Sequence, residues 1–181
     1  VLHPMTEDEL IDKCLQGDHR AQKALFDKFS GKMMSVCMRY AADREQAEDV
    51  LQDGFVKIFG HLSKFKREGS FEGWIRTTMV NTSLDSLRKK RAVTIDTDIS
   101  EVEYLAGTDE KSLGKLRVEE LMKLIHEMPT GYRTVFNMYA IEGYSHREIA
   151  YELGVTESTS KTQFRKARTC LMNIIGEREN I

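Results

Sequence analysis

The chain has 181 residues, which is enough for one medium domain or two small ones, and its 40% apolar content permits a packed core. The formal charge of −2 neither requires nor excludes a nucleic-acid partner. The two prolines and the lack of turn-rich, β-branched runs argue against an all-β protein and favour a helical one.

Three amphipathic helices are predicted in the first part of the chain, over residues 6–16, 18–40 and about 43–62. Thr6 and Glu9 have the spacing of a capping box, and Gly17 ends the first helix. Apolar residues at three- and four-residue steps define the buried faces of the other two. These are Ala21, Leu25, Phe29, Met33, Val36 and Tyr40, and then Ala47, Val50, Leu51, Phe55, Ile58 and Leu62. The opposite face of the third helix is polar and carries Glu48, Asp49, Gln52 and Asp53.

A basic segment with aromatic residues comes next. Gly69 interrupts this segment, and a helix is predicted from about residue 71 to 91. Ser70 can serve as the N-cap of that helix. Residues 64–91 hold eight Lys/Arg and three Asp/Glu, a net charge of +5, whereas residues 93–113 hold six Asp/Glu and one Lys, a net charge of −5. This change of sign predicts a binding surface followed by a solvated linker.

The rings of this basic segment have two interpretations. Trp74 and Ile75 recur at helical spacing with Phe71, which favours core positions. Phe65 and Phe71 could instead lie on the surface and contact a binding partner, and the sequence does not decide between core and surface for these two rings.

Helical periodicity returns near Leu116 and stops at Pro129, and a further helix is predicted over residues 131–142. Ser145 and Glu148 form a second capping box that opens a short helix, which Gly154 ends. Thr156 caps a last helix from residue 157 to about 176. A short capped helix followed by a glycine turn and a second helix is typical of a helix-turn-helix.

The last helix has two faces. Phe164, Ala167 and Leu171 point inward, with Ser160 one turn earlier. The outward face carries Ser158, Thr159, Lys161, Thr162, Arg165 and Lys166. Small hydroxyls permit close approach and cations neutralise phosphates, as entry into the major groove requires. A helical hairpin with a solvated basic face is the alternative.

Catalytic and metal-binding patterns are missing from the sequence. The five His and three Cys residues form no ligand or nucleophile constellation, and the paired carboxylates lack a third ligand at suitable spacing. Isolated cysteines fit a reducing cytoplasm and no disulfide framework. No apolar run approaches the roughly 20 residues of a membrane span, and no signal-peptide pattern occurs. We therefore expect no enzyme, cofactor, metal or membrane insertion.

Over residues 8–176 the sequence resembles a bacterial RNA polymerase sigma factor of the extracytoplasmic-function (ECF) group, which has only regions 2 and 4. The region 2 resemblance rests on AEDVLQDGF at 47–55, Phe71, WI at 74–75, Asn81, Asp85 and Leu87-Arg88. The region 4 resemblance rests on MP at 128–129, Gly143, Ser145, EIA at 148–150, LGV at 153–155, Thr159, Lys161 and KAR at 166–168. Two blocks in the right order make the resemblance specific.

The resemblance implies an all-α fold of two small helical domains joined by an acidic linker. Region 2 would span residues 1–92, the linker 93–115, and region 4 residues 116–181. It also implies an alternative sigma factor acting in the cytoplasm, with core RNA polymerase, promoter DNA and an anti-sigma factor as partners.

The resemblance implies three sets of contact residues. Polymerase would bind Asp49, Gln52, Asp53 and Val56. The −10 element would contact Lys64, Phe65, Lys66, Arg67, Ser70, Phe71, Arg76, Asn81, Arg88 and Lys89, with the loop from Lys64 to Ser70 forming a pocket for a flipped base. The −35 element would contact Ser158, Thr159, Lys161, Thr162, Gln163, Arg165 and Lys166.

The chain departs from the family pattern at two positions of the last helix. Ser160 stands where an apolar residue is usual, and Gln163 where arginine is common. Gln163 could pair with adenine, and Ser160 could loosen packing or hydrogen-bond to the preceding turn. A helix-turn-helix regulator acting without polymerase is the rival function, although such a regulator has no need for the helix containing AEDVLQDGF.

Overall fold

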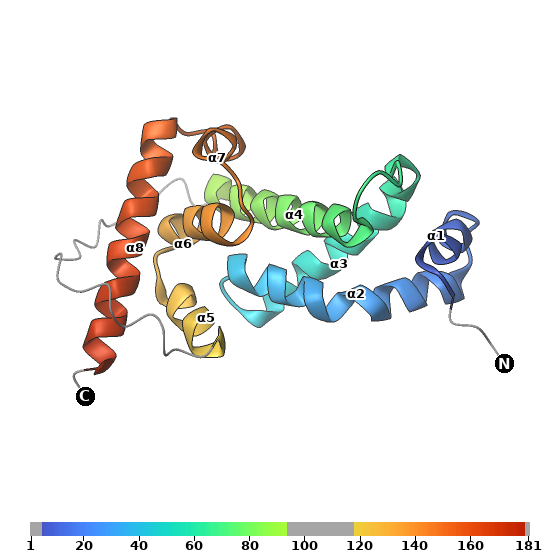
Figure 1. Cartoon of the computed structure of the whole chain (residues 1–181), viewed down its shortest axis with the longest axis horizontal. Helices are drawn as coiled ribbons and strands as arrows, with labels where there is room; N and C mark the ends of the chain where they lie inside the picture. Colours follow the sequence, from blue (N-terminus) through green and yellow to red (C-terminus); the bar gives the residue numbers. More distant parts are fainter. Residues whose placement is uncertain (1–4, 94–117, 180–181) are drawn as a thin grey trace. The chain divides into compact units, whose positions relative to one another are not determined.

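The computed structural model describes residues 5–93 and 118–179, and every regular element in these two ranges is helical (Figure 1). The predicted all-α fold class is confirmed. The chain divides into two compact units, Val1–Ile95 and Asp96–Ile181. The predicted linker of residues 93–115 lies almost wholly outside the described residues, so its boundaries stay a prediction.

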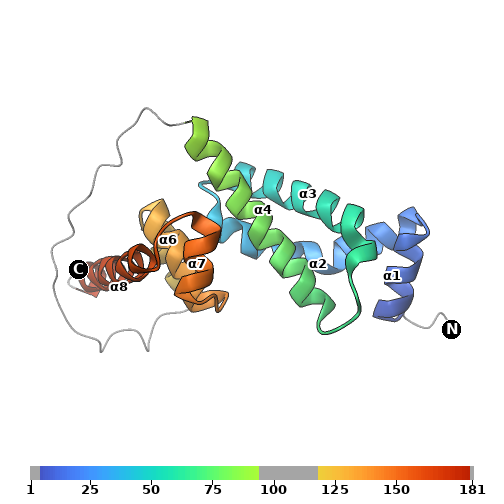
Figure 2. The same cartoon turned by 90° about the horizontal axis from the view of Figure 1, so that it is seen from above.

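The N-terminal unit consists of α1 (Glu7–Leu15), α2 (His19–Tyr40), α3 (Arg44–His61), a 3₁₀ turn η1 (Leu62–Lys64) and α4 (Phe71–Val93). Helices α2, α3 and α4 pack on one another in pairs, and α1 packs against α2 (Figures 1 and 2). All the apolar positions predicted for α2 and α3 are buried. From α4 the same core receives Phe71, Ile75, Met79, Val80 and Leu84.

Close approach of α3 and α4 depends on a glycine. A Cβ built on Gly54 would lie 2.3 Å from the Sδ atom of Met79, which is itself fully buried. Any larger residue at position 54 would therefore meet the side chain that fills the space between the two helices.

The predicted caps of the N-terminal unit are present. Thr6 and Glu9 form both bonds of the capping box, with the backbone N–H of Thr6 donating to Glu9 Oε2 at 2.9 Å. Ser70 Oγ accepts from the backbone N–H of Gly73 at 3.1 Å, so it caps α4. These contacts fix where α1 and α4 begin.

The C-terminal unit consists of α5 (Val118–Glu127), α6 (Thr130–Phe136), η3 (Asn137–Ile141), α7 (His146–Leu153) and α8 (Glu157–Glu179). Helix α8 packs against α5, α6 and α7. The core cluster lies between α5 and the second half of α8 and comprises Leu124, Ile125, Met128, Ala167, Cys170, Leu171, Ile174 and Ile175.

The helix predicted over residues 131–142 is α-helical only as far as Phe136. It continues as the π-helical turn η3, where the backbone N–H of Glu142 donates to Asn137 O at 2.9 Å. A π turn accommodates one extra residue in a helix. Asn137 and Met138 are fully buried there, so the turn belongs to the core of the unit.

The helix-turn-helix between α7 and α8 has the predicted turn and caps. Ser145 and Glu148 form the second capping box. Gly154 adopts the left-handed conformation with φ 66°, and the backbone N–H of Val155 donates to Ala150 O at 3.0 Å. Thr156 Oγ1 accepts from the backbone N–H of Thr159 at 3.0 Å and so caps α8.

Candidate nucleic-acid and protein interfaces

The first turns of α8 present a hydroxyl-rich and basic surface. Ser158, Thr159, Lys161, Arg165 and Lys166 are exposed, and Thr162 is half-buried. Lys161 Nζ lies 2.7 Å from Glu157 Oε1 one turn earlier. That hydrogen bond lowers the pKa of Glu157. Arg165 and Lys166 have no such neighbour among the ion pairs of the described residues, so they are the cations most available to an anionic partner.

Ser160 is fully buried and pairs with a residue of the other helix. Its Oγ lies 3.0 Å from His146 Nδ1, fourteen residues earlier at the start of α7. The His146 ring stacks on Tyr139 with centroids 4.3 Å apart, and its edge meets Phe164 at 5.8 Å. Ser160 therefore joins α8 to the start of α7. The sequence suggested either looser packing or a hydrogen bond to the preceding turn, and it did not predict this partner.

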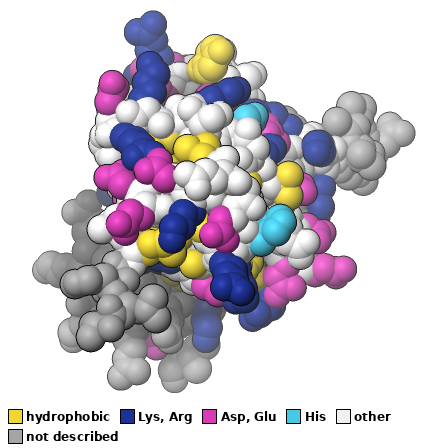
Figure 3. All heavy atoms as spheres, turned by 90° about the vertical axis from the view of Figure 1, so that its right-hand side faces the viewer, with side chains coloured by type: hydrophobic (Ala, Val, Ile, Leu, Met, Phe, Trp, Pro, Cys, Tyr) yellow, Lys and Arg dark blue, Asp and Glu magenta, His cyan; other side chains and the backbone are white. Residues whose placement is uncertain are grey.

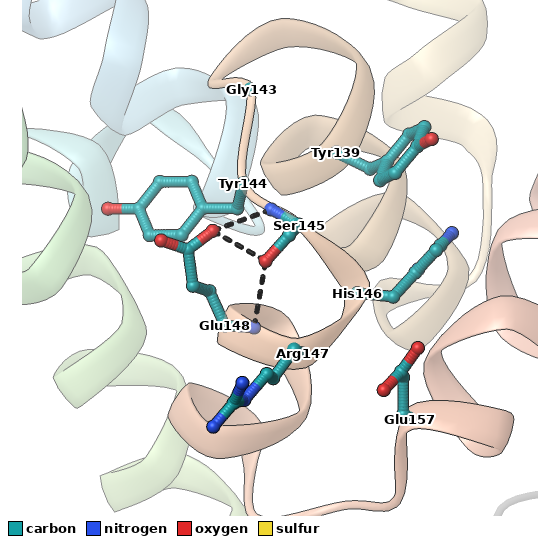
Figure 4. A pocket seen from close by; sticks show the side chains of 8 residues that line it. All are labelled: Tyr139, Gly143, Tyr144, Ser145, His146, Arg147, Glu148 and Glu157. Atoms are coloured by element: carbon teal, nitrogen blue, oxygen red, sulfur yellow. Dashed lines mark hydrogen bonds between the residues drawn. The ribbon is translucent and has the colours of Figure 1, made fainter.

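An open hollow of about 610 Å³ borders this pair, lined by residues from η3, the following turn, α7 and the start of α8. Figure 4 shows Tyr139 and His146 facing one another, with the Glu148 carboxylate turned back to Ser145. Two hydrogen bonds from Ser145 lower the pKa of Glu148. The carboxylate of Glu148 is thus already committed to the helix cap.

Gln163 differs from its neighbours in α8. Its side chain is half-buried, and its amide oxygen Oε1 is enclosed by protein. This oxygen faces Gly131 of α6 and would lie 3.8 Å from a Cβ atom added to that glycine. In this conformation its amide oxygen faces α6 rather than the basic surface. Pairing of Gln163 with adenine would require its side chain to turn outward.

The aromatic residues of the basic segment form one cluster with the core. Phe71 is 1% exposed and meets Phe29 of α2 edge-on, with centroids 5.7 Å apart. Phe65 is half-buried and lies 5.0 Å from Phe71 and 5.6 Å from Trp74. Ile75 is buried as expected, while Trp74 is only half-buried. Phe71 is therefore a core ring, and Phe65 is the accessible one.

The cations of this unit have different surroundings. Lys64, Lys66 and Lys89 are exposed, and so is Asn81 of α4. Arg88 Nη1 lies 2.7 Å from Asp85 Oδ1, and the other oxygen of Asp85 lies 2.9 Å from Lys57 Nζ of α3. Arg76 is half-buried. Arg67 is held by carboxylates of α1.

One exposed face of α3 carries the four residues predicted to bind polymerase. Gln52 and Asp53 lie three and four residues after Asp49, Val56 lies three residues after Asp53, and all four are exposed. Val56 is 72% exposed, which is unusual for a β-branched apolar side chain on a packed helix. Carboxylates around an exposed apolar residue suit a basic partner that also contributes apolar contact.

Other kinds of site find no support in the described part of the chain. No group of His, Cys, Asp and Glu residues there could hold a metal, and no described helix is long and apolar enough to cross a membrane. The three cysteines are buried, and burial raises the pKa of Cys37 to about 11.

Sequence reasoning missed the residues that hold the predicted contacts in place. These are His146, which pairs with Ser160, Asp85, which pairs with Arg88, and Asp8 and Asp12, which pair with Arg67. Only the spacing of Asp85 and Arg88, three apart on one helix, could have been read from the sequence.

Comparison with known proteins identifies both units. Residues 25–93 match the family described as Sigma-70 region 2, and residues 118–171 match Sigma-70, region 4. The chain is 24% identical over 176 residues to the RNA polymerase sigma-H factor of Pseudomonas aeruginosa, covering 91% of each. It is 25% identical over 182 residues to the ECF RNA polymerase sigma-E factor of Haemophilus influenzae, covering 94% of this chain and 96% of the relative.

Two solved structures share the fold. The sigma factor RpoE of Bartonella quintana, in complex with the anti-sigma factor NepR, aligns with a TM-score of 0.53 at 19% identity, covering 85% of this chain and 96% of that one. CnrH, in complex with the cytosolic domain of CnrY, aligns with a TM-score of 0.50 at 21% identity, covering 93% and 96%.

Proposed function

The chain belongs to the ECF group of sigma factors, and we propose that it binds core RNA polymerase and directs it to promoters through −10 and −35 contacts. The family is one of transcription initiation factors and not of enzymes. The observation that carries the proposal is the exposed face of α3 in the same chain as the helix-turn-helix. A regulator that acts on DNA alone would have no use for that face.

Docking on polymerase would use Asp49, Gln52, Asp53 and Val56 of α3. All four are exposed, so none of them belongs to the buried core of the unit. Burial of Val56 by a partner would remove apolar surface from water, and the carboxylates would select a basic partner surface.

Promoter opening would use helix α4 and the loop predicted from Lys64 to Ser70, of which residues 65–70 follow the 3₁₀ turn η1. Because Phe71 is buried, Phe65 and the neighbouring Trp74 are the rings left to contact an unstacked base. Lys64, Lys66, Asn81 and Lys89 are exposed along the same segment, where they can meet phosphates and base edges. Binding of a flipped base would offset the cost of about a few kcal/mol for unstacking it.

Recognition of the −35 element would use the exposed face of α8. Ser158, Thr159 and Thr162 permit close approach to the major groove, and Lys161, Arg165 and Lys166 supply the positive charge. The His146–Ser160 pair would fix α8 relative to α7, whose role in such motifs is to cross the DNA backbone.

The proposal extends to regulation and to the place of action. The two structures that share the fold are complexes, one with an anti-sigma factor and one with a cytosolic domain. By the same family relationship, we propose that an anti-sigma factor holds this chain and that it works in the cytoplasm, where core polymerase is.

The test is transcription with purified core polymerase on promoters from the genome that encodes the chain. The intact chain should give specific run-off transcripts, and Asp49→Ala with Gln52→Ala should abolish both transcription and co-purification with core polymerase. Asp27→Ala removes an exposed carboxylate of α2 and should leave both unchanged. Sequence-specific DNA binding by the chain alone, with no polymerase binding at any promoter, would contradict the proposal.

A further inference from the structure

Helix α1 makes ion pairs with the loop that we assign to the −10 element. Nη1 of Arg67 lies 3.4 Å from Asp8 Oδ1, and its Nη2 hydrogen-bonds to Asp12 Oδ1. Asp8 and Asp12 are four residues apart, so they occupy one face of α1 and reach the same guanidinium. Helix α1 precedes the segment that matches the sigma region 2 family, residues 25–93.

Arg67 has an unusual backbone conformation. Its φ is 58°, and it is the only residue other than glycine with positive φ in the described ranges 5–93 and 118–179. A side chain with a Cβ is disfavoured in this left-handed region, so something must hold it there. The two carboxylates of α1 are the groups that contact its side chain.

Helix α1 is itself firmly attached and can act as a support. Leu10, Ile11 and Cys14 are buried against the rest of the unit, and Lys28 of α2 lies 3.3 Å from Glu7. The capping box of Thr6 and Glu9 fixes its first turn. A change at Asp8 or Asp12 therefore removes the contact to Arg67 and leaves the buried residues and the Glu7–Lys28 pair that attach α1 to the rest of the unit.

We propose that Asp8 and Asp12 are positioning residues that hold the loop of residues 65–70, through Arg67, in the shape that accepts an unstacked −10 base. Phe65 lies two residues before Arg67, and its ring rests on Trp74 with centroids 5.6 Å apart. The conformation of Arg67 thus decides whether Phe65 stays against α4. The role of the loop in accepting a base rests on the proposed function.

The charge distribution assigns Arg67 to this support and not to DNA. Hydrogen bonding to Asp12 raises the pKa of Arg67, because the carboxylate favours the charged guanidinium. Seen from the side on which α1 lies in Figure 1, basic and acidic side chains are interspersed (Figure 3). The two nearby carboxylates offset the charge of the guanidinium, which makes it a weaker partner for a phosphate than an unpaired cation would be.

Trp74 gives a direct test in the absence of DNA, because it is the only tryptophan of the chain and touches Phe65. Quenching of its fluorescence by acrylamide, which is uncharged and so insensitive to the changes of charge, should increase in Asp8→Asn/Asp12→Asn and in Arg67→Ala. It should increase much less in Arg67→Gly, since glycine adopts positive φ without support. Asp27→Asn/Glu45→Gln removes the same charge at exposed positions of α2 and α3 and should behave as the unchanged chain.

Promoter opening with core polymerase is the second readout. Asp8→Asn/Asp12→Asn should reduce opening by about fivefold, the upper range for loss of exposed ion pairs, while Arg67→Gly retains it better than Arg67→Ala. Removal of two negative charges would by itself favour DNA, so a decrease cannot come from net charge.

Three results would overturn the inference. They are unchanged Trp74 quenching in Asp8→Asn/Asp12→Asn, stronger promoter opening by that variant, and equal losses in Arg67→Gly and Arg67→Ala. The proposed function is tested separately, with the unchanged chain: it fails if that chain binds no core polymerase and directs no specific transcription.

Discussion

Replacement of Gly54 by alanine should destabilise the N-terminal unit, although alanine is the better helix former. A Cβ at this position would lie 2.3 Å from Sδ and 2.7 Å from Cε of Met79. Atoms cannot approach so closely, so the Met79 side chain must move within a core where it is fully buried. Overpacking of this kind costs about 1–3 kcal/mol.

The gain in helix propensity opposes this cost. Exchange of glycine for alanine inside a helix stabilises by about 1 kcal/mol. The clash is the larger effect, so Gly54→Ala should lower the free energy of unfolding by about 0–2 kcal/mol. Gly31→Ala is the matched control, since Gly31 lies within α2, is exposed, and a Cβ added to it would meet no atom within 4 Å. It should raise stability by about 0.5–1 kcal/mol.

Urea unfolding followed by Trp74 fluorescence measures this difference in the N-terminal unit, because the only tryptophan lies in α4. Met79→Ala alone should cost about 2–5 kcal/mol, since it leaves a cavity. The double variant Gly54→Ala/Met79→Ala should lose less stability than the two single variants added together, by about 1–3 kcal/mol. Equal stabilisation by Gly54→Ala and Gly31→Ala, with no coupling to Met79, would refute the steric reasoning.

Three further results are expected. Ser160→Ala should destabilise the C-terminal unit by about 0.5–1.5 kcal/mol, because the hydrogen bond to the half-buried His146 is lost, and a double-mutant cycle with His146→Ala should show coupling. Because its pKa is lowered from 4.5 in the folded chain, Glu148 should contribute stability above pH 4.5 that is lost as the pH falls through the folded pKa. The urea concentration at the midpoint of unfolding, measured by circular dichroism, should therefore decrease less on acidification in Glu148→Gln than in the unchanged chain. Cys37, with its pKa raised to about 11, should resist a thiol reagent at neutral pH until urea unfolds the chain.

The helices could be predicted from the sequence because their signals are local. The apolar positions of α2 and α3, the capping boxes at Thr6 and Ser145, and the glycine turn at Gly154 depend on residues a few positions apart. The π-helical turn could not be predicted, since its extra residue is accommodated by tertiary packing around Asn137.

The surroundings of the candidate contact residues were beyond local signals. Arg67 and Asp12 are 55 residues apart, and Ser160 and His146 belong to different helices. Charge alone made Arg67 look available to DNA, whereas the fold places it between carboxylates. The sequence left open whether Phe65 and Phe71 are core rings, and packing against Phe29 identifies Phe71 as the buried one. The contacts to DNA and polymerase stay predictions.

The π-helical turn of Asn137–Ile141 also affects how this chain is compared with its relatives. One extra residue rotates everything after it by about 100° relative to a continuous α-helix. In a relative whose helix is α-helical throughout, the residues before and after this turn would face the core as they do here. The segment that joins them would be one residue shorter. A single-position gap within residues 137–141 would then mark the change from π to α in evolution, without any change in the helix-turn-helix that follows.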